Sequence, residues 1–362
     1  MKVLVISATF PPMRSGGGDH AFRLCQYLAE SGLDVRVLTS RIENVTTDSR
    51  ITIYPLMRRW SWREMPRLLA IIKRINPDVI NLHYSSPIYN HHPMVTFVPG
   101  IAKKICPKVR VVTQFEYPDG VPSGLPLLTR AGRTFAVHLV GWGDLSSAYG
   151  TILRDSDRII ALSEPHRELL TRGDTTLGEK CFVIPPPPIM PMCAESNGAV
   201  RQRARAALRV GDDEFLIAYY GYVYPGKGVE TLLEALSLVL KRRRVRLVVV
   251  GGSNEVVLRE LNRPQYPVEL HELTEQLGIA NQVSWTGYYP ADSDRGSFYL
   301  RGADIGVLPF DDGVRISRSS LAAVAAHGLP IITTKGDTAE SIFSHEENVL
   351  LCPPKEIGRA HV

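Results

Sequence analysis

The sequence lacks the features that would place it in several specialised classes of protein. Among its 362 residues are only five cysteines, which are odd in number, scattered and without a Cys-x-x-Cys pair: Cys25, Cys106, Cys181, Cys193 and Cys352. This pattern argues against both a zinc site and a disulfide framework. A reducing compartment fits it best, so we expect a cytoplasmic protein.

Long apolar runs are also missing. No window approaches the roughly 20 apolar residues that cross a bilayer. The opening run, residues 1–10, is shorter than a signal peptide and ends at Pro11-Pro12, and it therefore predicts a first β-strand. A large excess of one sign of charge is missing too. The 42 Lys and Arg residues nearly balance the 37 Asp and Glu residues, which leaves a net charge of +5. With 44% hydrophobic residues, the composition excludes a disordered chain.

What is present is an alternation of short apolar runs with helical patterns, which predicts an α/β fold with buried parallel sheets. The length favours about two domains. The run Pro185-Pro186-Pro187-Pro188 fits neither a helix nor a sheet interior and predicts a stiff linker. We therefore expect Rossmann-like domains at 1–188 and 189–362, with sheets facing a central cleft. Helices are expected at Asp19–Ser31 and Val229–Leu240, and strands at Val3–Ser7, Val35–Thr39, Val79–Leu82, Val109–Thr113, Arg158–Leu162, Phe182–Ile184, Leu216–Tyr220, Leu247–Val250, Val283–Thr286, Ile305–Leu308 and Ile331–Thr333.

Two glycine-rich turns follow the first expected strand of each domain. Gly16, Gly17 and Gly18 precede a helix start near Asp19, where backbone N–H groups can approach an anion. Their spacing is not Gly-x-Gly-x-x-Gly, so a dinucleotide site is poorly supported. The alternative is a loop that binds no ligand.

The second turn, Gly221–Gly228, contains Lys227 just before a helix start, where its ammonium can meet a phosphate. It is not a Walker A loop, because no Ser or Thr follows the lysine. The alternative for a loop lysine is a solvated side chain. A third anion-ready helix start lies in the segment Leu308–Pro330, with Asp312, Arg318 and Ser319 at its turn.

The order of several motifs resembles the GT-B glycosyltransferases, and within them the group called family 4. Besides the two turns, the resemblance rests on Asp78–His83, Ile160–Glu164, Val183–Pro185, Gly328–Thr334 and the run from Gly336 through Glu340 to Asn348. It covers nearly the whole chain. The resemblance implies a GT-B fold and transfer of a sugar from an activated donor, with retention of anomeric configuration and without a metal.

The resemblance also implies roles for particular residues. Lys227 matches the family lysine that neutralises the donor diphosphate, and His83 matches a histidine that follows the fourth strand and lies near the transferred sugar. We predict both as catalytic. The predicted donor-binding residues are Gly16, Gly17, Gly18, Gly221, Lys227, Gly252, Asp312, Arg318, Ser319 and Glu340.

Four positions depart from the family pattern. Tyr222 replaces an arginine, Phe115 replaces a histidine, and Arg315 and Ala323 stand where two glutamates hold the donor sugar and ribose. For the missing groups we hypothesise that Asp312 supplies a carboxylate and Arg318 supplies the diphosphate cation.

Two acidic pairs and one histidine pair invite a metal-site hypothesis, which we reject. Asp155-Ser156-Asp157 precedes an expected strand, and Asp292-Ser293-Asp294 precedes a helix start, where aspartates are common. His91-His92 has no evident third ligand.

The basic residues gather in short runs, 58–63, 201–209 and 241–246. Such runs are usually solvated helix faces. Because Arg58, Arg59 and Arg63 stand beside Trp60 and Trp62, contact with an anionic membrane surface is a second hypothesis for that run.

We therefore expect a glycosyltransferase that acts on a nucleoside diphosphate sugar and a glycan or lipid-linked hydroxyl acceptor, in polysaccharide, glycolipid or cell-envelope assembly. No cofactor and no nucleic-acid partner are expected. We expect the protein to lie in the cytoplasm or at the inner face of the cytoplasmic membrane. The alternatives are a catalytically silent GT-B protein that binds nucleotide or a partner, and a sugar-nucleotide epimerase.

The last six residues, 357–362, match the translation of a common sequencing-adapter DNA. On that hypothesis the native sequence ends near Glu356, and the closing helices of the family are missing from this chain.

Overall fold

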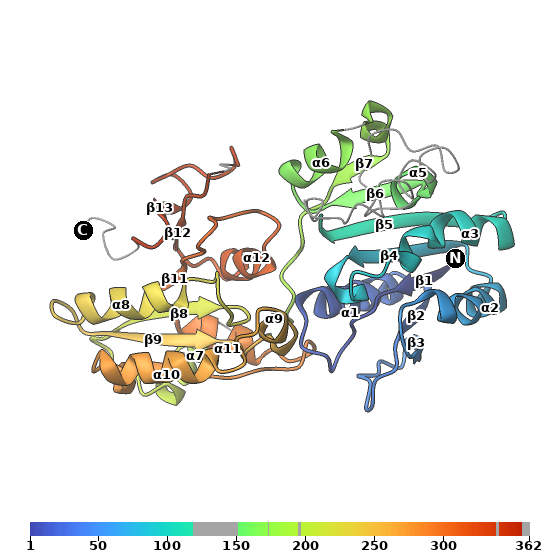
Figure 1. Cartoon of the computed structure of the whole chain (residues 1–362). Coiled ribbons are helices and arrows are strands. Elements are labelled where there is room, and N and C mark those ends of the chain that lie inside the picture. The colour runs from blue at the N-terminus through green and yellow to red at the C-terminus, as the bar shows by residue number, and fades with distance from the viewer. Residues whose placement is uncertain (119–150, 173, 195–196, 338–339, 357–362) are drawn as a thin grey trace. The chain divides into compact units, whose positions relative to one another are not determined.

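The computed structural model describes residues 1–118, 151–172, 174–194, 197–337 and 340–356. The chain divides into two compact units (Figure 1). Unit 1 comprises residues 1–13 and 17–185, and unit 2 comprises residues 14–16 and 186–362. Each unit is built on its own parallel sheet. The α/β class predicted from the alternation of apolar runs is confirmed.

Unit 1 contains, within the described residues, a seven-stranded sheet in the order β3-β2-β1-β4-β5-β6-β7, in which every neighbouring pair is parallel. Its strands are β1 Lys2–Ile6, β2 Asp34–Ser40, β3 Ile51–Met57, β4 Val79–Ser85, β5 Arg110–Tyr117, β6 Arg158–Ala161 and β7 Cys181–Val183. The central strands are buried almost throughout, as parallel strands covered on both faces must be.

Helices connect these strands and cover the sheet. They are α1 Gly16–Glu30, α2 Met65–Ile75, α3 Val98–Ile105, α5 Ile152–Asp155 and α6 Glu164–Thr171, with short 3₁₀ turns η1 Trp62–Glu64, η2 Pro87–Tyr89, η3 Pro93–Phe97 and η5 Thr175–Glu179. Leu68 and Ile72, one turn apart on α2, are fully buried against the strands.

Unit 2 contains, in the part of the chain described, a six-stranded sheet in the order β10-β9-β8-β11-β12-β13, also parallel. Its strands are β8 Phe215–Tyr220, β9 Val245–Val250, β10 Val283–Trp285, β11 Ile305–Leu308, β12 Ile331–Thr334 and β13 Leu350–Cys352. The helices are α7 Asn197–Ala207, α8 Val229–Val239, α9 Glu255–Glu260, α10 Tyr266–Gln276, α11 Arg295–Gly302 and α12 Ser319–Ala326, with η6 Ala280–Gln282. Helix α7 packs on α11 (Figure 1). Helix α8 contacts α10.

Two expectations about the elements need correction. Helix α1 begins at Gly16, not at Asp19, so the three glycines form its first turn. The sequence pattern also missed the edge strands β3 and β13. Strand β3 contains Pro55, which an edge strand tolerates because one side of it forms no ladder, and β13 has only three residues.

The order of strands creates a switch point in each sheet. In unit 1, β1 lies between β2 and β4; in unit 2, β8 lies between β9 and β11. The chain leaves the switch strand for one side of the sheet and later returns to the other, so the loops after these strands diverge. Ligands of open α/β sheets bind at such points, beyond the carboxyl ends of the strands.

None of the helices in the described ranges is long and apolar enough to cross a membrane.

The packing of α12 on β11 leaves no room for a side chain at Gly306. A Cβ built there would lie 2.2 Å from Cγ1 of Val324. We therefore predict that Gly306→Ala lowers the free energy of unfolding by about 1–3 kcal/mol through overpacking. Gly198, on α7, has open space around it, and Gly198→Ala should change stability by less than about 1 kcal/mol. Chemical denaturation of both variants checks this, and equal losses would contradict it.

Candidate functional site

His83 lies at the carboxyl end of the sheet of unit 1. It belongs to β4, which continues to Ser85, so it lies within the strand and not after it as the resemblance implied. Parallel pairing sets His83 beside Gln114 on β5. Its ring is fully buried, and Nδ1 lies 2.9 Å from Oε1 of Glu116. Nε2 is buried and, within the described residues, has no hydrogen-bond partner.

Glu116 is the centre of this buried cluster. Its Oε1 accepts a hydrogen bond of 2.7 Å from Nε2 of Gln114 and lies 3.4 Å from Nδ1 of His20, on α1. The rings of His20 and His83 meet edge to face at 5.8 Å. A carboxylate, two histidines and an amide from three elements thus converge, and we call them the His83–Glu116 cluster.

Burial and charge shift the pKa values of the two histidines in opposite directions. Burial disfavours the protonated form of His20, but the charge of Glu116 and its hydrogen bond outweigh burial and raise the pKa of His20. Burial lowers the pKa of His83 against the opposing effect of Glu116, and the charge of His20 adds to that lowering. Although burial alone would raise it, the pKa of Glu116 is held low by His20 and His83. The cluster therefore favours the protonated form of His20, the ionised form of Glu116 and the neutral form of His83.

A neutral His83 that donates from Nδ1 to Glu116 presents Nε2 as a hydrogen-bond acceptor. This is the tautomer that can accept a proton or a hydroxyl hydrogen bond from a substrate.

The first turn of α1 lies against the same cluster. A Cβ at Gly17 would lie 3.6 Å from Cγ of Glu116, and one at Gly18 would lie 3.1 Å from the carbonyl carbon of Thr9. Gly18 thus permits a close backbone approach, whereas Gly16 has open space around its Cα. Of the predicted loop glycines, Gly17 thus lies beside the His83–Glu116 cluster in unit 1.

In unit 2, the turn after β8 is shaped by glycines in left-handed backbone conformations. Gly226 has φ +93° and Gly228 has φ +68°, and a Cβ at Gly228 would lie 1.8 Å from the carbonyl oxygen of Pro309. The amide of Asp311 donates to the carbonyl of Gly226 at 3.1 Å. These contacts hold the turn against the loop that follows β11.

Lys227 is half-buried at this junction. Its Nζ lies 4.9 Å from the ring centre of Tyr224 and 5.2 Å from that of Phe310. Burial lowers the pKa of Lys227, and the charge of Arg318 lowers it further. Within the described residues Lys227 forms no ion pair with a carboxylate.

Arg318 precedes α12 and stacks on the same aromatic ring, with Cζ 4.1 Å from the centre of Phe310. It forms an ion pair with Asp312, whose second carboxylate oxygen lies 3.5 Å from Nη2 of Arg315. The structure therefore brings together Lys227, Arg318 and Asp312, which the sequence predicted separately. As it stands, the carboxylate of Asp312 is bound by two arginines.

The remaining glycines and Ser319 frame this junction. A Cβ at Gly221 would lie 3.2 Å from Cβ of Ser320, and one at Gly252 would lie 2.8 Å from Cβ of Tyr288. The carbonyl of Gly252 accepts a hydrogen bond from the amide of Val223 at 3.0 Å. Gly252 thus supports the turn that carries Lys227. Ser319 is the first residue of α12 and is partly exposed.

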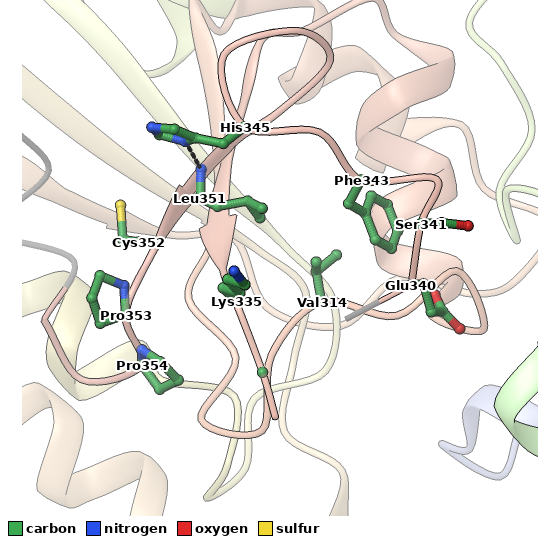
Figure 2. Close-up of a pocket in the computed structure, with 11 residues that line it drawn as sticks. Val314, Lys335, Glu340, Ser341, Phe343, His345, Leu351, Cys352, Pro353 and Pro354 are labelled. Carbon is green, nitrogen blue, oxygen red and sulfur yellow. Dashed lines mark hydrogen bonds between the residues drawn. The ribbon is translucent and has the colours of Figure 1, made fainter. Parts of the chain in front are cut away.

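Glu340 lies on the wall of a hollow of about 600 Å³ beside β12 and β13 (Figure 2). Its Oε2 accepts a 2.6 Å hydrogen bond from the amide of Ile316, which fixes the loop before α12. Its Oε1 is buried without a partner among the residues described. Val314 and Lys335 line the same hollow.

The four departures from the family pattern have structural roles here. Tyr222 stacks on Tyr288 with ring centres 6.5 Å apart, and Phe115 is fully buried against Tyr84. Ala323 is buried in α12, where its carbonyl accepts a hydrogen bond from His327. Arg315 pairs with Asp312 as described above.

Two of the three pairs rejected as metal ligands have partners of their own. Asp155 pairs with Arg154, and Asp157 accepts a 2.7 Å hydrogen bond from the amide of Val111. Nδ1 of His92 accepts from the amide of Met94. Asp294 precedes α11, but its side chain makes no cap bond.

Sequence reasoning missed Glu116 and His20. Glu116 follows Phe115, the replaced position, and its role is visible only once β4 and β5 pair in register. His20 carries no signal beyond a histidine inside an amphipathic helix.

Family models match both halves of the chain. One, described as glycosyltransferase family 4, matches residues 14–187, and another, described as glycosyl transferases group 1, matches residues 200–361.

Among curated proteins, an uncharacterized glycosyltransferase from Methanocaldococcus jannaschii is 24% identical, over 98% of this chain and 86% of that protein. A D-inositol 3-phosphate glycosyltransferase from Segniliparus rotundus is 28% identical over 51% of this chain and 38% of its own length. Among solved structures, Anabaena HepE in complex with UDP and glucose superposes with a TM-score of 0.66 at 16% identity, over 99% of this chain and 87% of that one. That likeness is one of fold.

The pairing of His20 with Glu116 predicts a pH-dependent stability. Because the pKa of His20 is raised above its usual 6.5 on folding, the pair stabilises the fold fully below that value and loses its contribution as pH rises through the folded pKa. We expect His20→Gln to cost about 1–3 kcal/mol near pH 6, and less near pH 9. Thermal melts of both proteins at the two pH values measure this.

The control is the same substitution in a Glu116→Gln background, where the charge partner is gone. There burial lowers the pKa of His20 unopposed, so the cost of His20→Gln should be no larger near pH 6 than near pH 9. An equal cost at both pH values in the Glu116 protein would contradict the assignment.

Proposed function

Because the chain belongs to the family 4-like glycosyltransferases of the GT-B fold and is therefore a sugar transferase, we propose that it takes its sugar from a nucleoside diphosphate sugar. We propose a hydroxyl acceptor in polysaccharide, glycolipid or cell-envelope assembly, reaction in the cytoplasm, and retention of anomeric configuration without a metal. The observation that carries the proposal is the placement of Lys227 and Arg318 on one aromatic ring at the switch point of unit 2.

The departing diphosphate needs positive charge. Breaking the bond between sugar and phosphate leaves negative charge on the diphosphate, which preorganised cations stabilise. Lys227 is half-buried, has a cationic neighbour and forms no ion pair with a carboxylate in the part of the chain described. An anion bound there would supply the missing negative charge, and would favour the protonated lysine.

Arg318 is proposed for the second phosphate contact, in place of the arginine that Tyr222 replaces. Its guanidinium is planar and can bind phosphate with two hydrogen bonds. Since Asp312 is paired with Arg318 and Arg315, we propose that it orients Arg318, whereas contact with the sugar hydroxyls remains the alternative for it. Gly16, Gly17, Gly18, Gly221, Gly252, Ser319 and Glu340 stay predicted donor-binding residues.

His83 is proposed to act on the transferred sugar or its acceptor. Support comes from the unpartnered Nε2, which Glu116 holds as an acceptor by binding Nδ1. The nucleotide bound to Anabaena HepE, UDP, is consistent with a nucleoside diphosphate sugar as donor. The acceptor class rests on the resemblance alone.

A silent nucleotide-binding protein is the second candidate, favoured by Arg315 and Ala323 at the positions of the family glutamates. A panel of nucleoside diphosphate sugars in calorimetry, followed by a product assay, separates the two. Binding without any product favours the silent protein, and a changed sugar without an acceptor product favours an epimerase.

We predict that Lys227→Ala lowers the rate of donor turnover by about 10²–10³-fold, the usual effect of removing one transition-state contact. Lys227→Arg should retain part of the rate, because the charge stays. Initial rates of nucleoside diphosphate release measure this.

The matched control is Lys241→Ala, an exposed lysine of the same unit, which should leave the rate unchanged. An undiminished rate in a folded Lys227→Ala protein would refute the role of this lysine.

A further inference from the structure

One surface of unit 1 gathers exposed arginines around a tryptophan. We call it the arginine–tryptophan face and define it by the side chains of Arg41, Leu56, Arg58, Arg59, Trp62, Arg63, Arg67 and Arg74. They come from β3, from the residues directly after β2 and β3, from the turn η1 and from α2. Two neighbouring hollows, of about 460 and 650 Å³, share Arg58 as a common wall.

The two tryptophans of this segment face opposite ways. Trp60 is 4% exposed, donates from Nε1 to Oγ of Ser40 at 2.8 Å and meets the ring of Tyr89 edge to face. It anchors the segment to the core. Trp62 is 48% exposed and rests on Phe97, with ring centres 5.3 Å apart. The fold thus fixes the loop by one tryptophan and presents the other.

Most of the arginines on this face have no counter-charge. Arg67 pairs with Glu64, which is the one acidic residue lining either hollow. In the described ranges the other five form no ion pair: Arg41, Arg58, Arg59, Arg63 and Arg74. By contrast, Arg36 and Arg50, elsewhere on the same unit, are paired with aspartates. The face therefore carries a local positive charge that the protein leaves unmatched.

Other basic runs of the chain differ in this respect. Arg201 and Arg205 bind Asp304 and tie α7 to the sheet of unit 2. The run 241–246 is exposed at its first four residues but holds no aromatic residue. Among the three basic runs, only the one in the arginine–tryptophan face combines arginines that form no ion pair in the described ranges with an exposed tryptophan. Leu56, which is 44% exposed, lies on the same face.

We propose that the arginine–tryptophan face docks unit 1 on an anionic lipid bilayer. Arginines bind lipid phosphates through charge-assisted hydrogen bonds, and tryptophan prefers the interface between headgroups and acyl chains. A peripheral contact of this kind needs no spanning helix. The inference goes beyond the proposed sugar transfer and does not depend on it, because docking is measured without donor or acceptor.

The test is co-sedimentation of the full chain with vesicles. We expect binding to vesicles of phosphatidylcholine with phosphatidylglycerol, weak binding to pure phosphatidylcholine, and release at about 0.5 M NaCl, where charges are screened. Arg59→Glu with Arg63→Glu should weaken binding roughly tenfold or more, since each basic residue near the surface contributes about a fivefold factor. Trp62→Ser should weaken it by a smaller factor that persists in salt.

The matched control is Arg242→Glu with Arg243→Glu, which makes the same charge change on exposed residues of unit 2. It should bind vesicles nearly as well as the unchanged protein, and melting temperatures verify that all variants are folded. Equal binding to both vesicle types, or equal loss in the control, would overturn the proposal. So would capture by single-stranded RNA in the presence of excess anionic vesicles, which would identify a nucleic-acid surface.

Donor turnover without vesicles should be unchanged in the Arg59 and Arg63 variant, which keeps this test separate from the proposed function.

Discussion

A backbone contact between two loops of unit 2 sets the geometry on which the proposed donor site depends. Gly228 passes so close to the carbonyl of Pro309 that no Cβ fits, and Asp311 closes the contact with a hydrogen bond to Gly226. The sheet order places both loops at the switch point. As a result Lys227 and Arg318, far apart in sequence, share the ring of Phe310. Two cations held this close repel each other, and the diphosphate of the proposed donor would remove that cost.

In unit 1 the main electrostatic feature is the carboxylate of Glu116. A carboxylate at Glu116 lies inside the protein, where an unpaired charge is costly. His20 supplies the charge and Gln114 a neutral hydrogen bond, so His83 can stay neutral while its Nδ1 is held by the same carboxylate.

Sequence reasoning predicts the large features and misses those created by register and packing. Apolar periodicity predicts the central strands, because buried parallel strands need continuous apolar residues. It misses β3, whose Pro55 marks an edge strand, and the start of α1, because glycine is a poor helix former. Motif order points to Lys227 and His83, and charge and position point to Arg318. No pattern indicates Glu116 and His20, which meet His83 only through the pairing of β4 with β5 and the packing of α1. The clustering of arginines around Trp62 is visible in sequence, whereas the inward turn of Trp60 is not.

Lys227 and Arg318 are proposed to form one anion site. A double-mutant cycle of UDP binding, measured by titration calorimetry on Lys227→Ala, Arg318→Ala and the double variant, tests it most directly. We predict that each single change weakens UDP binding, and that the two effects are not additive, with a coupling of about 0.5–3 kcal/mol. UDP binding by the folded double variant as tight as by the unchanged protein would contradict it.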